Sequence, residues 1–229
     1  MKTSLKWIND YLNNSINLDA DAVADLAEKI ERTSVEIADS TTLAQQQDGL
    51  VVAKVMSVTS HPDSDHMVIA QVDIGESKLT QVVTGAPNIA EGQFVILAKV
   101  GAHIINHDTG ELIELKPAEL RGKVSNGMLV ALQEIGFDSK ISPKDFEAGI
   151  YVFGENENVQ PGDDALTVLG MDEPVLDTDL TPNRADMLSM IGTAYELGAM
   201  LNQAVTLPDF DLVEYESPAK NQVSLFIDD

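Results

Sequence analysis

The sequence has 229 residues, enough for one large or two modest domains, and its hydrophobic content of 44% is typical of a globular protein. It contains no cysteine, which excludes disulfides and thiolate zinc sites. No apolar run approaches the length of about 18 residues that a membrane span needs, and the start, MKTSLKWINDYLNNS, lacks the apolar core of a signal peptide. We therefore expect neither export nor a membrane span, and a cytoplasmic location.

The charge is strongly negative and unevenly distributed. The chain has 38 acidic and 14 basic residues, a net charge of -24, and residues 155–179 hold eight carboxylates and no Lys or Arg. A protein that binds nucleic-acid phosphates usually presents a basic face. The middle of the chain has a smaller excess of negative charge. Its basic residues are Lys54, Lys78, Lys99, Lys116, Arg121, Lys123, Lys140 and Lys144.

Two helices are predicted at the start of the chain. Ser4 can cap the first, and Asp19 or Asp21 can cap the second. The apolar residues at helical spacing are Leu5, Ile8 and Leu12 in the first helix and Val23, Leu26, Ala27 and Ile30 in the second. Two short helices cannot bury these stripes alone, so they need a partner elsewhere. A strand at 33–39 and a polar linker at 40–49 follow.

Residues 50–132 are predicted to form a β-rich unit. Short runs rich in Val, Ile, Leu and Thr are separated by Gly, Pro, Asn and Asp clusters, as expected for strands and turns. The predicted strands are 50–59, 68–74, 79–84, 94–99 and 127–132. Five short strands suit a closed OB-type Greek-key barrel. The pattern alone leaves a small β-sandwich open.

The remaining chain is predicted to alternate short helices and strands. We expect a loop with helical tendency at 137–147, a strand at 149–153, a helix at 165–170 and a strand at 175–180. The clearest helix is 187–201. We expect Asp186 to be its N-cap and Asn202 to end it. The expected apolar face consists of Leu188, Ile191, Ala194, Leu197 or Gly198, and Leu201.

Three motifs in the β-rich unit occur in the order and spacing of a known family. HPDSDHM at 61–67 resembles the HPxADKL turn of the tRNA-binding OB domains found in phenylalanine–tRNA ligase β subunits, methionyl-tRNA synthetase extensions and EMAP-like proteins. GAPN at 85–88 resembles the same family's GAPN loop. LRG at 120–122 and SNGM at 125–128 resemble its LRG…S.GM segment. The chain departs from the family at His66-Met67, where Lys-Leu is usual, so this turn lacks a positive charge.

A second resemblance extends over most of the chain. MKTSLKWI at 1–8 resembles the MKxSLKWL start of bacterial phenylalanine–tRNA ligase β subunits, and DLTPNRADMLS at 179–189 resembles their DLTPNRxDxLS signature. Met187 and Tyr195 replace the commoner Cys and Arg. The resemblance is to the N-terminal part of such a β subunit.

This resemblance implies an α+β fold with a discontinuous domain. An EMAP-like, tRNA-binding OB-fold β-barrel at 41–149 would be inserted into a small α/β domain made of residues 1–40 and 150–203. The second half of that domain would supply the missing partner for the two N-terminal helices. Residues 204–229 would be a linker and the start of a further domain.

The candidate nucleic-acid-binding residues have polar or basic side chains in or near these motifs. They are Lys54, His61, His66, Arg121, Lys123, Ser125 and Asn126. OB barrels bind nucleic acids on a strand-and-loop face of this kind, although a solvated hairpin explains the two cations beside Gly122 equally well. Phe94 and Phe137 are the only aromatic residues in 50–137, so the segment has little capacity for base stacking.

The histidines and aspartates of the turn at 61–67 are not predicted to bind a metal. A calcium loop starting at Asp63 would need Gly at its sixth position and Glu at its twelfth, where Val68 and Ile74 stand. Zinc bound by His61 and His66 is less favoured than ordinary turn chemistry, in which the Asp side chains accept hydrogen bonds from backbone N–H groups.

No residue of this chain is predicted to be catalytic. The segment 181–186, TPNRAD, is interpreted as structural, with Pro182 fixing a turn, Asp186 capping a helix and Arg184 pairing with nearby carboxylates. Triad, Walker, kinase and dinucleotide fingerprints do not occur in the sequence.

The resemblance implies membership of an enzyme that joins phenylalanine to tRNA(Phe) using ATP and magnesium. The family's assembly holds two α and two β chains, and its synthetic active site lies in the α subunit. We therefore expect no cofactor in this chain and no activity of the chain alone. Two alternatives are a free-standing tRNA-binding or chaperone-like OB protein, and a protein–protein scaffold without RNA affinity, which the net charge favours.

Overall fold

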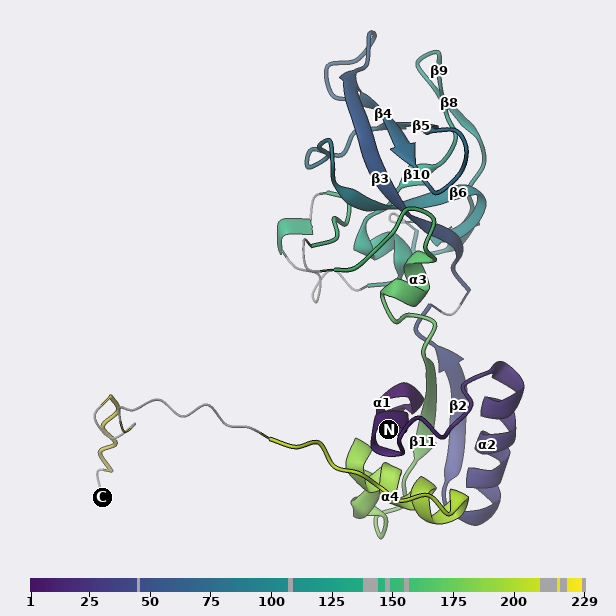
Figure 1. Ribbon diagram of the computed structural model, residues 1–229, viewed down its shortest axis with the longest axis vertical. Coiled ribbons are helices and arrows are strands. Elements are labelled where there is room, and N and C mark those ends of the chain that lie inside the picture. The colour runs from purple at the N-terminus through teal and green to yellow at the C-terminus, as the bar shows by residue number, and fades with distance from the viewer. Residues whose placement is uncertain are drawn as a thin grey trace.

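The computed structural model has two lobes (Figure 1). It describes residues 1–44, 46–106, 109–137, 144–146, 149–154, 157–210, 218 and 222–227. The chain passes from the small lobe into the large one after β2 and returns through β11. No helix in these ranges has both the length and the hydrophobicity that crossing a bilayer requires.

The small lobe is built on a three-stranded antiparallel sheet whose central strand comes from late in the chain. Its order is β1-β11-β2, and its strands are β1 (Lys2–Ser4), β2 (Glu36–Thr42) and β11 (Pro174–Asp179). Thr3 pairs with Leu176 on one side of β11, and Ile37 pairs with Thr178 on the other. Because β11 separates β1 from β2, the sheet needs segments from both sides of the large lobe.

Three helices enclose the core of the small lobe. They are α1 (Leu5–Tyr11), α2 (Ala20–Thr33) and α4 (Met190–Leu201), and a short 3-10 turn, η3 (Ala185–Met187), precedes α4. The buried core residues include Leu5, Ile8, Leu12, Val23, Leu26, Ile30, Leu176, Met187, Ala194 and Leu197. The predicted helices after Ser4 and Asp19 are thus confirmed, and segment 174–201 provides the partner that their apolar stripes need.

The large lobe is an antiparallel β structure with short helical pieces. Its strands are β3 (Asp48–Ser60), β4 (Val68–Asp73), β5 (Thr80–Thr84), β6 (Phe94–Ile105), β7 (Leu112–Glu114), β8 (Ala118–Leu120), β9 (Lys123–Ser125) and β10 (Met128–Leu129). Its helical pieces are η1 (Leu132–Ile135), η2 (Lys144–Phe146) and α3 (Ala165–Val168). The main sheet has the order β10-β6-β3-β4-β5, β7 pairs with β6, and β8 and β9 form a separate hairpin.

The sheet is not closed by paired strands in the described part of the chain. Its ladders form a path that ends at β5 and β10. These two ends are linked instead by individual bonds, such as that from the Asn126 N–H to the Gln81 carbonyl at 2.9 Å. The antiparallel β unit is confirmed, whereas the closed OB barrel is not.

Several predicted strand boundaries are wrong. The strand predicted at 94–99 continues to Ile105 as β6, and the one predicted at 127–132 is reduced to β10, because η1 begins at Leu132. Residues 149–153 form one isolated bridge, between Val152 and Val95, and no strand. The predicted strand 33–39 begins and ends about three residues later, as β2. In the loop predicted at 137–147, residues 138–143 and 147 lie outside the described ranges.

The prediction that Asp186 caps the last helix is also wrong. The N-cap of α4 is Ser189, whose side chain accepts a hydrogen bond from the Gly192 N–H, and Asp186 pairs with Arg184 instead. Leu188 is 65% exposed and Ile191 37% exposed, so neither belongs to the buried face. Asn202 ends the helix with a positive φ of 53°, as predicted.

Residues 150–154 and 157–171 pack on the large lobe. Phe153, Val159, Leu166 and Met171 join the core cluster that contains Leu50, and Ile150 joins the neighbouring cluster. The small-lobe core takes no member from this stretch and resumes at Leu176.

Candidate nucleic-acid interface

His61 connects the turn at 61–67 to the β8–β9 hairpin. Its side chain is 3% exposed, its Nδ1 accepts a hydrogen bond from the Asp63 N–H at 3.1 Å, and its Nε2 lies 3.2 Å from the Leu120 carbonyl. A carbonyl can only accept, so the proton is on Nε2 and the ring is neutral. Both ring nitrogens are therefore occupied by contacts within the protein.

Arg121 makes a second connection between the same two segments. Its Nη1 donates to the Asp63 carbonyl at 2.6 Å. Arg121 and Gly122 have φ values of 48° and 76°, which suit a tight two-residue hairpin turn, and Leu120 pairs with Lys123 across it. We call these two connections, His61 to Leu120 and Arg121 to Asp63, the hairpin–turn clamp.

Ser125 and Asn126 hold the base of the hairpin against β5. The buried Ser125 Oγ accepts from the Val83 N–H at 3.0 Å and donates to the Gly127 carbonyl at 2.8 Å. The Asn126 N–H donates to the Gln81 carbonyl, and Gln81 in turn donates from its side chain to Val124. The Ser125 side chain thus serves packing within the lobe, while the Asn126 side chain is exposed.

The remaining candidates differ in their accessibility. His66 is exposed on the turn and Lys123 is partly exposed on β9. The Lys54 ammonium lies 5.4 Å from the centre of the Phe94 ring, a cation–π contact on β3. The structure therefore brings six candidates together around the hairpin–turn clamp, and no described contact joins Lys54 to them.

The turn's own hydrogen bonds differ from the prediction. The described acceptors for its backbone N–H groups are the His61 ring and carbonyl, the Ser64 hydroxyl and the Met67 carbonyl. None of them is an aspartate side chain. Within the described ranges, no three His, Asp or Glu side chains are grouped closely enough to hold a metal ion.

Asn88 has a role that the sequence analysis did not identify. Its side-chain amide donates to the Ile150 carbonyl at 2.8 Å and accepts from the Ile150 N–H at 3.0 Å. The amide therefore imitates the pairing of one strand residue with another. The GAPN loop therefore fastens residue 150 to the large lobe.

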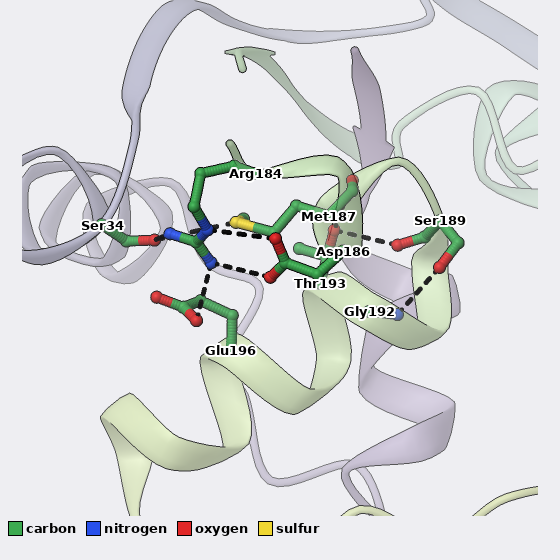
Figure 2. A network of polar contacts seen from close by, with 8 residues as sticks. All are labelled: Ser34, Arg184, Asp186, Met187, Ser189, Gly192, Thr193 and Glu196. Atoms are coloured by element: carbon green, nitrogen blue, oxygen red, sulfur yellow. Dashed lines mark hydrogen bonds and ion pairs between the residues drawn. The ribbon is translucent and has the colours of Figure 1, made fainter. Parts of the chain in front are cut away.

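The segment 181–186 forms a polar network in the small lobe, as Figure 2 shows. Arg184 donates to both carboxylate oxygens of Asp186 at 3.2 and 3.0 Å and to Ser34 Oγ at 2.9 Å, and it lies 2.9 Å from Glu196. These bonds from Arg184 hold the pKa of Asp186 below its usual value. The predicted pairing of Arg184 with nearby carboxylates is confirmed, and it connects the end of α2 to η3 and α4.

Residues 50–151, which form most of the large lobe, carry only a small part of the net negative charge. Residues 50–151 contain 13 acidic and 8 basic residues, against 25 acidic and 6 basic residues in the rest of the chain. Repulsion of a phosphate backbone is therefore weaker at this lobe than the net charge of -24 suggests.

A comparison with protein families gives a match within the large lobe. Residues 50–151 match the family model described as a putative tRNA binding domain. Of solved structures, the MetRS-related protein of Pyrococcus horikoshii is 20% identical, with a TM-score of 0.34 over 52% of this chain and 88% of that chain.

Over its whole length the chain is similar to part of the phenylalanine–tRNA ligase β subunit. It is 46% identical over 228 residues to the subunit of Staphylococcus aureus (strain Mu50) and 44% identical to that of Staphylococcus haemolyticus. Each comparison covers 100% of this chain and 27% of the relative, so the chain spans about a quarter of its relatives' length.

Proposed function

We propose that this chain is the N-terminal part of the β subunit of a cytoplasmic phenylalanine–tRNA ligase, which attaches phenylalanine to tRNA(Phe) using ATP. The observation that carries the proposal is that similarity to ligase β subunits covers the entire chain, including both lobes. In this proposal the chain contributes a tRNA-binding and scaffold module and no active site. ATP and magnesium act elsewhere in an assembly of two α and two β chains.

In the same proposal the large lobe is an OB-type domain inserted into the small lobe. The proposed division is 1–40 with 150–203, 41–149 and a C-terminal linker from 204, and the position of β11 between β1 and β2 supports its discontinuity. The packing of Ile150, Phe153 and Met171 on the large lobe favours a junction near Asp172, rather than at residue 150, for the return into the small lobe.

The proposed RNA contact is the exposed side of the hairpin–turn clamp. His66, Lys123 and Asn126 remain accessible there, and so do the Arg121 N–H groups that do not bind Asp63. His61 and Ser125 support this surface from within, because their polar atoms are occupied. Lys54 is proposed only as a peripheral contact.

The test is a fluorescence-anisotropy titration of labelled tRNA(Phe) with this chain at about 50 and about 200 mM salt. We expect weak binding that declines with salt, and a Lys123→Gln variant with lower affinity and a salt slope smaller by about one. Lys6→Gln, on the exposed side of α1, is the control and should bind like the parent chain. Absence of binding at low salt would contradict the RNA contact.

A second candidate, a protein scaffold without RNA affinity, is favoured by the net charge of -24. It predicts no tRNA binding in the titration, together with co-purification of this chain with the ligase α subunit. Either form of the proposal expects no ATP–pyrophosphate exchange by the chain alone, and detectable exchange would contradict both.

A further inference from the structure

A cavity opens between the turn at 60–68 and the GAPN loop, beside the hairpin–turn clamp. Its volume is about 650 Å³, within the range of sites that enclose small ligands. Its apolar lining residues are Val58, Met67, Val68, Ala86, Pro87 and Ile89. Of the residues proposed to contact the RNA backbone, His66 also lines this cavity, while Lys123 and Asn126 do not.

The polar side of the cavity offers one strong hydrogen-bond acceptor. Asp65 and His66 line it and are exposed, and the Asp65 carboxylate makes no hydrogen bond or ion pair within the described part of the chain. His61 also borders the cavity, but both of its ring nitrogens are occupied. A ligand therefore meets a carboxylate whose oxygens can accept hydrogen bonds, next to a flat imidazole ring.

These features match an unstacked nucleobase. Proteins that recognise RNA sequence commonly take a base out of the stack, pack its face against side chains and read its Watson–Crick edge. Guanine is the RNA base whose Watson–Crick edge presents two adjacent donors, N1–H and the N2 amino group, which suit the two oxygens of one carboxylate. A neutral base edge also avoids the repulsion that a phosphate would meet near Asp65.

We propose that this cavity binds an unstacked guanine of RNA, with its Watson–Crick edge on Asp65 and its faces against Met67, Pro87 and His66. The inference rests on the proposed RNA-binding function and specifies where the chain binds RNA and which base it recognises. Arg121, whose guanidinium is fixed on the neighbouring Asp63 carbonyl, is placed to meet the phosphate of the same nucleotide.

Gly85 allows the cavity to be blocked without straining the backbone. A Cβ at this position meets only the His66 carbonyl oxygen within 4 Å, at 3.8 Å, across the gap between loop and turn. Gly85→Leu therefore fills the space that a base needs. Gly154→Leu is the matched control, because a Cβ there meets nothing within 4 Å and Gly154 does not line the cavity.

The experiment records NMR amide shifts of the chain during titration with guanosine, adenosine, cytidine and uridine 5′-monophosphates. Guanosine monophosphate should shift the resonances of residues 60–68 and 85–89 and bind about tenfold more tightly than the other three. Asp65→Asn should remove this preference. Asp63→Asn also removes one carboxylate, but at a residue that does not line the cavity, so this variant should retain the preference. Equal response to all four nucleotides, or none at the cavity, would overturn the proposal.

A tRNA(Phe) titration of the same variants separates this inference from the proposed function. Weaker tRNA binding by Gly85→Leu, with Gly154→Leu unchanged, would support the guanine site. If Gly85→Leu binds tRNA like the parent chain, the guanine site is wrong and the RNA-binding function stands. If the parent chain binds guanosine monophosphate at the cavity but does not bind tRNA, the proposed RNA-binding function is wrong, while guanine remains the ligand of the cavity.

Discussion

Arg184 shows how much one side chain contributes when its partners come from separate elements. Its side chain is 19% exposed, and its guanidinium contacts Ser34 beyond α2, Asp186 in η3 and Glu196 in α4. Two parallel bonds to Asp186 use the planar fork of arginine, which lysine lacks. The sequence predicted carboxylate partners for Arg184, but it could not identify Ser34, which is distant along the chain.

We expect Arg184→Lys to lower the free energy of unfolding at neutral pH by about 1–2 kcal/mol, because a single ammonium cannot satisfy all three partners. Urea denaturation measures the change. Arg32→Lys is the matched control: its pair with Glu28 is exposed on α2, so the change should stay within about 0.5 kcal/mol. An equal loss of unfolding free energy in both variants would show that the Arg184 network stabilises the fold no more than an exposed ion pair does.

The same network predicts how the difference in unfolding free energy between the parent chain and Arg184→Lys depends on pH. Hydrogen bonds from Arg184 lower the pKa of Asp186 in the folded state, so its carboxylate stabilises the fold above the usual value of 3.8. This contribution is lost as the pH falls through the lowered pKa. The gap between the parent chain and Arg184→Lys should therefore narrow in strongly acidic buffer, and a gap independent of pH would contradict the assignment.

At the scale of elements, the β8–β9 hairpin depends on Ser125 at its base. Replacement by alanine removes the acceptor for the Val83 N–H and the donor to the Gly127 carbonyl in a buried place. We expect Ser125→Ala to destabilise the chain by about 1–3 kcal/mol in urea denaturation. Asn126→Ala, at the exposed neighbouring position, should have little effect. If both variants are equally stable, Ser125 has no structural role here.

The elements that were predicted correctly are those with a strong hydrophobic period. β3, β4 and β5 alternate or concentrate buried Val, Ala and Leu, and α1 and α2 carry clear apolar stripes. β7 and β8 are short and exposed, so no periodicity marks them. Their pairing depends on distant partners, including the contacts of His61 and Arg121.

The start of α4 could not be decided from local signals. Asp186 and Ser189 are both good N-cap residues. Ser189 caps the helix because Arg184 engages Asp186, and because Gly192 allows the chain to pass close to the Asp186 carbonyl, where a Cβ would clash. The candidate site could also be predicted only in part. The sequence identified its residues, but the structural roles of His61 and Ser125 depend on hydrogen-bond partners that are distant along the chain.

At the scale of the whole molecule, the small lobe has a core of its own. All members of its hydrophobic cluster lie before residue 38 or after residue 175. Thr42 and Pro174 are direct partners in the β2–β11 ladder, so the two strands can be joined by a tight turn. We expect a chain in which Asn-Gly replaces residues 43–173 to fold and to unfold cooperatively in urea, with a smaller m-value than the parent.

The comparison for this prediction is a chain that lacks only residues 43–148. It retains Ile150, Phe153 and Leu166, which are buried against the large lobe and would lose their partners. This longer chain should expose apolar surface and bind the dye ANS more strongly than the shorter one. Failure of the shorter chain to show a cooperative transition would mean that the small lobe depends on the large one.

The position of β11 also sets an order of folding during synthesis on the ribosome. β1 and β2 emerge early, but both pair only with β11, and the segment between Thr42 and Pro174 takes on the order of ten seconds to translate. During this time the large lobe can assemble, whereas α1 and α2 keep their apolar stripes exposed. The lobe that contains the first residues of the chain is therefore the last to fold, and nascent-chain chaperones have that interval in which to bind it.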